Sequence, residues 1–195
     1  MRMKQRAGTQ PATVLYCESN VDGTVGGSHQ CLLNLVENLD RSRYRPIVVF
    51  YEPHVLVDRF RSAAEVVVLD RDTPVRWGED SNAVAAAPLV AARRAVNSLQ
   101  LARKVGSNVA FLRKRGVSLV HLNNSIANHH EWMAAARLTG TPCIVHERGM
   151  PRYRMADRFW GREVKLIIPM SRAIADAMVG QGVSPANIRV MYDGV

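Results

Sequence analysis

Residues 14–39 read VLYCESNVDGTVGGSHQCLLNLVENL, and this stretch decides the fold of the chain. It begins with a short apolar run at 14–17, which is typical of a buried strand. A polar segment with three glycines follows. Apolar residues then recur at spacings of three and four, as on the buried face of a helix: Leu32, Leu35, Val36 and Leu39. Ser28 is expected to cap that helix, so the order is strand, glycine loop, helix.

The same alternation continues to the end of the chain. Apolar runs predict further strands at 46–51, 66–69, 119–122, 144–146 and 166–168, and a last one at 188–192. Helical periodicity lies between them, at 55–63, 83–115, 128–139 and from 171 to 180 or 182. The long helix is expected to break near Pro88 and Gly106. Strands that alternate with helices predict an α/β fold with a doubly wound, Rossmann-like parallel sheet.

Composition indicates an ordinary globular protein, with 47% hydrophobic and 22% charged residues. Three cysteines without paired spacing argue against a disulfide framework and fit a reducing compartment. The basic N-terminal stretch lacks the apolar segment of a signal peptide, and no apolar run approaches the ~20 residues that span a bilayer. We therefore expect a cytoplasmic protein with a basic tail at 1–12 and one domain at 13–192.

The formal net charge of +9 favours anionic partners, such as nucleic acid, acidic lipid headgroups or phosphorylated small molecules. In the helix predicted at 83–115, Arg93, Lys104 and Arg115 fall on one face. Phe111 shares that face, and the opposite side is predicted to be apolar: Leu99, Leu101, Val105, Val109 and Leu112. The basic face is either an ordinary solvated surface or a contact with anionic lipid. Nucleic acid is less favoured, because no reader motif is present.

The glycine loop lies where a parallel α/β sheet binds its ligands, at the carboxyl end of a strand. Thr24, Gly26 and Gly27 belong to it. Backbone N–H groups of glycines can approach an anion closely, and the following helix N-terminus favours negative charge. The spacing matches neither the dinucleotide fingerprint nor the P-loop. Two interpretations stay open: a phosphate-binding loop, or a turn that only leads a strand into a helix.

Two clusters of ionisable residues follow predicted strands. His146 ends the strand at 144–146 and is expected to face the ligand crevice, although it could also be a satisfied core histidine. Glu147 and Arg148 come next and could pair with each other in solvent. The other cluster lies at 129–131, where two adjacent histidines precede a glutamate. Adjacent helical residues point about 100° apart, so we expect no metal site there.

Several segments together resemble a known family. They are the glycine loop and its helix, LVHLNN at 119–124, IVH at 144–146, MSRAIAD at 170–176, GV at 182–183, IRV at 188–190 and YDGV at 192–195. The set is similar to the N-terminal domain of the family-4 retaining glycosyltransferases of the GT-B fold. The resemblance covers nearly the whole chain.

The resemblance implies two Rossmann-like domains that face a cleft, with the acceptor held by the N-terminal one. The substrates would be a nucleoside diphosphate sugar and a sugar or lipid-linked acceptor, and no metal or other cofactor is implied. Gly26 and Gly27 would reach the donor diphosphate and the acceptor. His146 would lie by the transferred sugar as the catalytic residue. The acceptor cleft would contain Asn124, Glu147 and Arg148.

Two departures from the family pattern are visible. Asp193 stands where the family's closing turn has Asn, a mild change because both tolerate turn conformations. The family's paired glutamates, which belong to its second domain, have no counterpart here. We therefore expect a fragment that is inactive alone, with 193–195 starting the linker to a donor-binding domain. A peripheral position on the inner face of the membrane is compatible with the basic helix. The alternatives are a GT-B sugar-nucleotide epimerase or hydrolase, and a basic flavodoxin-like binding module.

Overall fold

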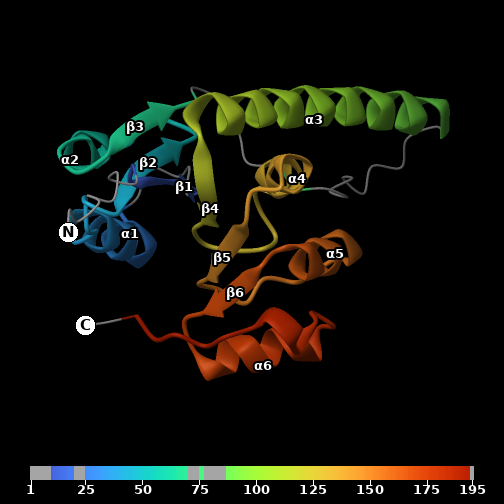
Figure 1. Ribbon diagram of the computed structural model, residues 1–195. Helices are drawn as coiled ribbons and strands as arrows, with labels where there is room; N and C mark the ends of the chain where they lie inside the picture. Colours follow the sequence, from blue (N-terminus) through green and yellow to red (C-terminus); the bar gives the residue numbers. More distant parts are fainter. Residues whose placement is uncertain (1–9, 20–24, 70–74, 77–86, 194–195) are drawn as a thin grey trace, which may run out of the picture.

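Six parallel strands form one sheet in the order β3-β2-β1-β4-β5-β6 (Figure 1). The computed structural model describes residues 10–19, 25–69, 75–76 and 87–193, with backbone only at 87–97. The strands are β1 (Ala12–Glu18), β2 (Tyr44–Phe50), β3 (Glu65–Val68), β4 (Val117–Leu122), β5 (Cys143–Glu147) and β6 (Leu166–Pro169). The helices are α1 (Gly27–Glu37), α2 (Val57–Arg61), α3 (Ala87–Arg115), α4 (His130–Thr139), α5 (Met155–Glu163) and α6 (Arg172–Gly180). The predicted doubly wound, Rossmann-like α/β sheet is confirmed.

Helices pack on both faces of the sheet, and alternate residues of β1 separate the two cores. Val14 and Tyr16 pack with residues of α1 and α2. Leu15 and Cys17 belong to the larger core, which residues of α3, α4, α5 and α6 complete. Trp132 of α4 is the largest fully buried side chain there. A strand buried on both faces needs a continuous apolar run, and this is what residues 14–17 supply.

The chain reverses its direction of winding between β1 and β4. β1 pairs with β2 on one side and with β4 on the other, so Tyr16 lies opposite both Val48 and His121. In sheets of this kind, ligands bind in the crevice outside the carboxyl ends of the two strands at such a switch point. The segments that follow β1, β4 and β5 therefore surround the expected site.

Two predictions about elements were wrong. The segment 188–192 forms one isolated bridge, between Ile188 and Ile167, in place of a strand. Its outer residues Met191 and Tyr192 are exposed, so burial does not favour a longer pairing. α3 is unbroken over 29 residues. Gly106 meets no neighbouring atom and costs an exposed helix only about 1 kcal/mol, and Pro88 lies in the first turn, where its missing N–H is tolerated.

Candidate functional site

The glycine loop enters α1 at the carboxyl end of β1. α1 begins at Gly27, so the predicted cap Ser28 lies inside the helix, and Gly26 is the N-cap. The N–H of Gly26 donates to Nδ1 of the buried His29 over 3.3 Å. A Cβ added at Gly27 would meet nothing within 4 Å, and the φ of Gly27 is not positive. The protein's own packing therefore does not require glycine at 27, and the space beside it is open. Thr24 lies outside the described residues.

A buried carboxylate joins β1 to the segment after β4. Glu18 is fully buried and accepts hydrogen bonds from the amides of Asn123, over 2.6 Å, and Asn124. Asn123 also donates to the carbonyl oxygen of Ser28 over 3.3 Å, which attaches the framework to α1. Asn124 has a φ of +99°, in a region that Asn tolerates better than most residues. Asn124 is thus part of a hydrogen-bonded framework at the carboxyl ends of β1 and β4, and its place in an acceptor cleft stays a prediction.

Arg148 extends this framework toward β5. Its Nε donates to Oδ1 of Asn123 over 2.9 Å, and its backbone N–H donates to the carbonyl oxygen of Asn124 over 2.8 Å. The guanidinium also forms an ion pair with Asp193. Both partners are largely buried, with side-chain exposures of 11% and 22%. The contacts with Asn123 and Asn124 fix the orientation of the arginine, and the ion pair with Asp193 uses the terminal NH1 group.

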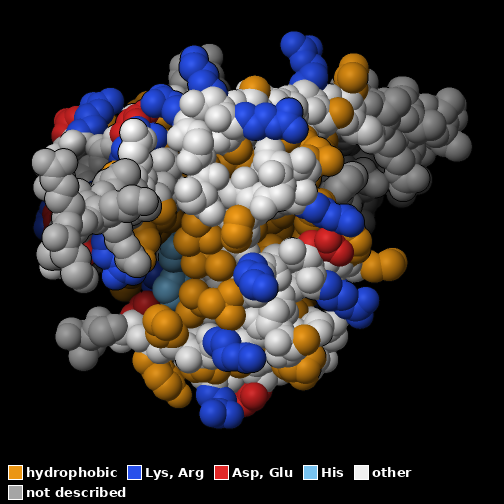
Figure 2. All heavy atoms as spheres, in the orientation of Figure 1, with side chains coloured by type: hydrophobic (Ala, Val, Ile, Leu, Met, Phe, Trp, Pro, Cys, Tyr) orange, Lys and Arg blue, Asp and Glu red, His pale blue; other side chains and the backbone are white. Residues whose placement is uncertain are grey.

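His146 lies beside Arg148 on the same side of the crevice. Its ring stacks on His121, with centroids 5.5 Å apart and planes 26° apart. Burial and the neighbouring Arg148 lower the pKa of His146 to about 4, so the ring is neutral at neutral pH. Neither ring nitrogen has a hydrogen-bond partner among the described residues, although the side chain is mostly buried. An unmet buried polar group costs about 1–3 kcal/mol, and a hydrogen bond from a bound ligand would remove this cost. Figure 2 shows histidine atoms in a recess beside a hydrophobic area.

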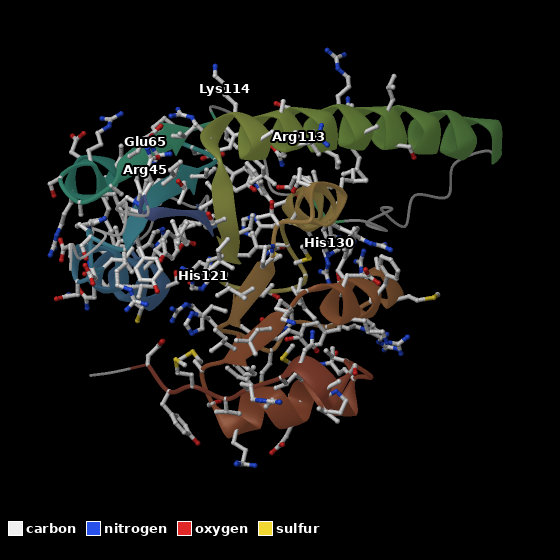
Figure 3. The ribbon with its side chains drawn as sticks, viewed as in Figure 1. Arg45, Glu65, Arg113, Lys114, His121 and His130 are labelled. Carbon is white, nitrogen blue, oxygen red and sulfur yellow. The ribbon has the colours of Figure 1, made fainter. Side chains whose placement is uncertain are left out.

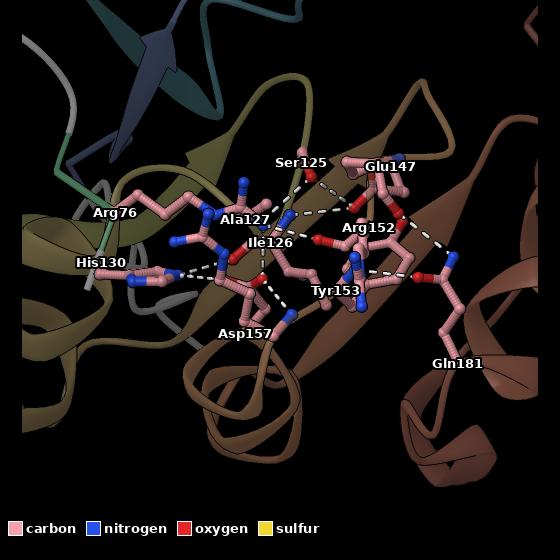
Figure 4. Close-up of polar contacts among 12 residues, drawn as sticks. Arg76, Ser125, Ile126, Ala127, His130, Glu147, Arg152, Tyr153, Asp157 and Gln181 are labelled. Atoms are coloured by element: carbon pink, nitrogen blue, oxygen red, sulfur yellow. Dashed lines mark hydrogen bonds and ion pairs between the residues drawn. The ribbon is translucent and has the colours of Figure 1, made fainter. Parts of the chain in front are cut away.

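Glu147 does not line the crevice, and this part of the predicted acceptor site was wrong. Successive strand residues point to opposite faces, so Glu147 points away from His146. It is fully buried and accepts hydrogen bonds from Ser125 Oγ (3.0 Å) and the N–H of Ile126 (2.9 Å) (Figure 4). Burial raises the pKa of Glu147 to about 8. Its role is to hold the segment between β4 and α4, and it does not pair with Arg148, which pairs with Asp193.

The residues at 129–131 belong to a second buried network. Nε2 of His130 lies 3.0 Å from the carbonyl oxygen of Ile126 and 3.2 Å from Asp157. Asp157 also pairs with Arg76 over 2.8 Å (Figure 4). Glu131 accepts from the hydroxyl of Tyr51 over 2.6 Å. These contacts are structural, and within the described ranges no three potential ligands gather around a possible metal position.

The basic face predicted for α3 is not formed as the helical wheel placed it. Lys104 is half-buried and lines a pocket of about 350 Å³ beside Glu131. Arg115 pairs with Glu65 over 2.6 Å. The ring of Phe111 packs on Trp132 at 5.8 Å and also contacts the Arg115 guanidinium at 5.6 Å, whereas Leu99, predicted on the apolar side, is 64% exposed. The side chain of Arg93 lies outside the described residues.

Exposed basic residues nevertheless gather at the C-terminal end of α3. Arg113 and Lys114 lie there (Figure 3), next to Arg115, which contacts Arg45 of β2 and Glu65 of β3. The predicted contact with an anionic surface stays a prediction, and this end of α3 is where such a contact would form. No helix in the described part of the chain has both the length and the apolar character needed to cross a membrane.

Sequence reasoning did not assign Glu18 or Asn123 to the site, and it noted Asp193 only as a departure from the family pattern. A glutamate that ends an apolar strand run, and an Asn-Asn pair that follows another, were the available signals. Their meeting depends on the pairing of β1 with β4, which the sequence does not specify locally.

Comparison with known proteins gives one family and a consistent fold. The family model described as "Glycosyl transferase 4-like domain" matches residues 26–194. No curated protein matches the chain. Anabaena HepE in complex with UDP superposes with a TM-score of 0.64 at 18% identity, covering 94% of this chain and 44% of that one. A glycosyltransferase from Rickettsia africae superposes with a TM-score of 0.66 at 15% identity, covering 96% and 44%.

The same fold extends beyond glycosyltransferases. A putative UDP-N-acetylglucosamine 2-epimerase from Listeria monocytogenes superposes with a TM-score of 0.57 at 8% identity, covering 92% of this chain and 45% of the epimerase. The chain therefore spans less than half the length of each of these three structures. It corresponds to half of a GT-B fold.

Proposed function

Because this chain belongs to the glycosyl transferase 4-like domain family, we propose that it is the acceptor-side, N-terminal half of a retaining glycosyltransferase. The enzyme would transfer a sugar from a nucleoside diphosphate sugar to an acceptor hydroxyl. HepE was solved with UDP and with UDP-glucose, so a UDP-hexose is the first donor to test. A second domain, equivalent to the rest of the matched structures, would hold most of the donor.

One observation carries the proposal. His146, with both ring nitrogens unpaired among the described residues, lies beside Arg148 at the carboxyl edge of the sheet. The N-terminus of α1, with open space at Gly27, belongs to the same edge. A neutral donor, a fixed cation and an open helix N-terminus are the groups that a sugar attached to a diphosphate requires.

The chemistry needs little from the protein besides positioning and charge. The bond between the anomeric carbon and the phosphate oxygen breaks, and the diphosphate leaves with the electron pair. The acceptor oxygen bonds to the same face of the sugar, and its proton passes to the departing phosphate oxygen. His146, neutral because its pKa is lowered to about 4, would donate a hydrogen bond to a sugar hydroxyl. Arg148 and the N-terminus of α1 would stabilise the developing negative charge.

Transfer assays on the polypeptide that carries both halves test the proposal. We would supply UDP-glucose, UDP-galactose and UDP-N-acetylglucosamine with a panel of sugar and lipid-linked acceptors, and follow sugar transfer and UDP release. His146→Ala should lower kcat about 100-fold, since it removes a positioned polar group. Its melting temperature should stay near that of the wild type.

Lys165→Ala is the control, because Lys165 is exposed and immediately precedes β6. It therefore lies at the amino ends of the strands, away from the crevice at their carboxyl ends. It should leave both measurements unchanged. A change of configuration at one carbon of the donor sugar, without transfer to an acceptor, would instead assign the epimerase activity. An unchanged kcat with a lower melting temperature in His146→Ala would make His146 a core residue.

A further inference from the structure

Asp193 lies between the two polar side chains that the proposed function uses. Its carboxylate forms the ion pair with Arg148 and lies 4.0 Å from Nε2 of His146. The thiol of Cys31, on α1, is 3.5 Å from the same carboxylate. A carboxylate from a late segment of the chain thus occupies the point where β5 and α1 meet the crevice.

Arg148 does not depend on Asp193 for its orientation. Asn123 accepts from its Nε, and the buried Glu18 fixes Asn123 in turn. The ion pair with Asp193 uses a different part of the guanidinium, its terminal NH1 group. The cation would therefore stay in place, with a terminal donor available, if the carboxylate moved away.

Asp193 does not satisfy the hydrogen-bonding groups of the His146 ring. At 4.0 Å, the carboxylate is too far from Nε2 for a hydrogen bond. Both ring nitrogens are nevertheless buried and lack a hydrogen-bond partner in the described part of the chain. A substrate group can reach this ring only if a neighbouring group moves, and the carboxylate of Asp193 lies 4.0 Å from Nε2.

The segment that carries Asp193 is held at the edge of the sheet. Met191 donates its N–H to the carbonyl oxygen of Pro169 over 3.1 Å, but the side chains of Met191 and Tyr192 are exposed. Moving Asp193 therefore exposes no core side chain. Phosphate and carboxylate oxygens make the same charge-assisted contacts with an arginine.

We propose that Asp193 is a displaceable counter-ion: its carboxylate occupies the position of a substrate phosphate oxygen at Arg148, and phosphate binding expels it and uncovers His146. The inference that an anion binds at Arg148 depends only on these contacts. Its assignment to a donor diphosphate or to a phosphorylated acceptor rests on the proposed function. Because Asp193 lies in the segment proposed to lead to the second domain, phosphate binding would also release that segment.

Binding of inorganic pyrophosphate and of inorganic phosphate to the 195-residue chain tests this inference without any need for turnover. Asp193→Asn keeps the shape of the side chain and removes the competing charge. We expect it to bind pyrophosphate about tenfold more tightly in isothermal titration. The NMR signal of the His146 ring should shift on binding. Arg148→Gln should abolish binding, and circular dichroism would verify that each variant is folded.

Asp176→Asn is the matched control, because it removes one negative charge from an exposed position on α6. Its affinity should equal that of the wild type. Equal or weaker binding by Asp193→Asn would overturn the inference, and so would an equal gain in Asp176→Asn. A tenfold gain with pyrophosphate alone assigns the anion site to the donor diphosphate, and a tenfold gain with phosphate alone assigns it to a phosphorylated acceptor. Failure of the transfer assay would leave this result unaffected.

Discussion

At Gly27 the open space beside the backbone can be probed with side chains of increasing size. A Cβ there meets no protein atom within 4 Å, and the backbone is not in the left-handed region, so neither Ala nor Val should strain the fold. If a diphosphate or acceptor approaches this backbone, Gly27→Ala should lower kcat/KM of the two-domain enzyme modestly, and Gly27→Val at least tenfold. Initial rates against donor and acceptor concentration, with thermal melts, would measure this.

Gly106→Ala is the control for that series, since Gly106 is also surrounded by open space but lies on the exposed side of α3. It should leave the rates unchanged and stabilise the helix by up to about 1 kcal/mol. Near-normal rates in Gly27→Val would mean that Gly26 and Gly27 only form a turn between β1 and α1 and do not contact a substrate.

The predictability of the site differs from residue to residue. His146 was placed at the crevice because of its position at a strand end, where a parallel sheet presents its ligands, whereas Arg148 was placed in the acceptor cleft by the family resemblance; both assignments stay predictions. Glu147 was assigned to the wrong side because the alternation of side chains along β5 was not applied to it. Glu18 and Asn123 could not be paired from the sequence, since they lie 105 positions apart and meet only through strand order. Asp193 was noted as an unusual residue, but its partner was not predicted.

At the scale of elements, Glu147 makes the attachment of the β4–α4 segment dependent on pH. Its pKa is about 8 in the folded protein and 4.5 as the ordinary value, so the folded state binds a proton more tightly than the unfolded state. The stability from this group is fully present below about pH 4.5 and is lost as the pH rises through 8. The slope approaches about 1.4 kcal/mol per pH unit within this window.

Glu147→Gln should remove that slope while an amide oxygen still accepts from Ser125 and Ile126. Urea unfolding of both proteins between pH 5 and 8.5 gives the difference curve, in which contributions from other groups cancel. We expect the variant to gain relative stability as the pH rises. A flat difference curve would mean that Glu147 is ionised in the folded protein throughout.

α3 shows why elements were easier to predict than their orientation. Helical periodicity predicted a long helix over 83–115, and α3 is one, although the break expected near Pro88 and Gly106 does not occur. Its buried side could not be read from the wheel, because both sides carry apolar residues and only packing against α4 selects Leu101 and Leu112 over Leu99. The prediction of a strand at 188–192 was wrong for a related reason. No second layer covers the apolar side chains of this segment, and Met191 and Tyr192 are exposed.

At the scale of the whole molecule, we predict that residues 1–195 fold alone and do not catalyse transfer. The six strands are internally paired and two hydrophobic cores are complete, so a cooperative unfolding transition is expected. This chain covers 44% of HepE, and the half of the matched structures that we propose to hold the donor lies outside the matched part. Circular dichroism melts and the UDP-sugar assays described above would measure both properties. Robust turnover by this chain alone would contradict the proposal that a second domain is needed to bind the donor.

The central position of β1 has a consequence for synthesis on the ribosome. β2 and β3 follow β1 closely and can pair with it early, but β4 is translated about 100 residues after β1. At ordinary elongation rates, the other edge of β1 waits about 5–20 s for its neighbour. During that interval an apolar strand edge is available to other chains, which is an aggregation hazard. The crevice itself, which needs Glu18 to meet Asn123, forms only after β4 has docked, so ligands and inhibitors of this site cannot assist the nascent chain before then.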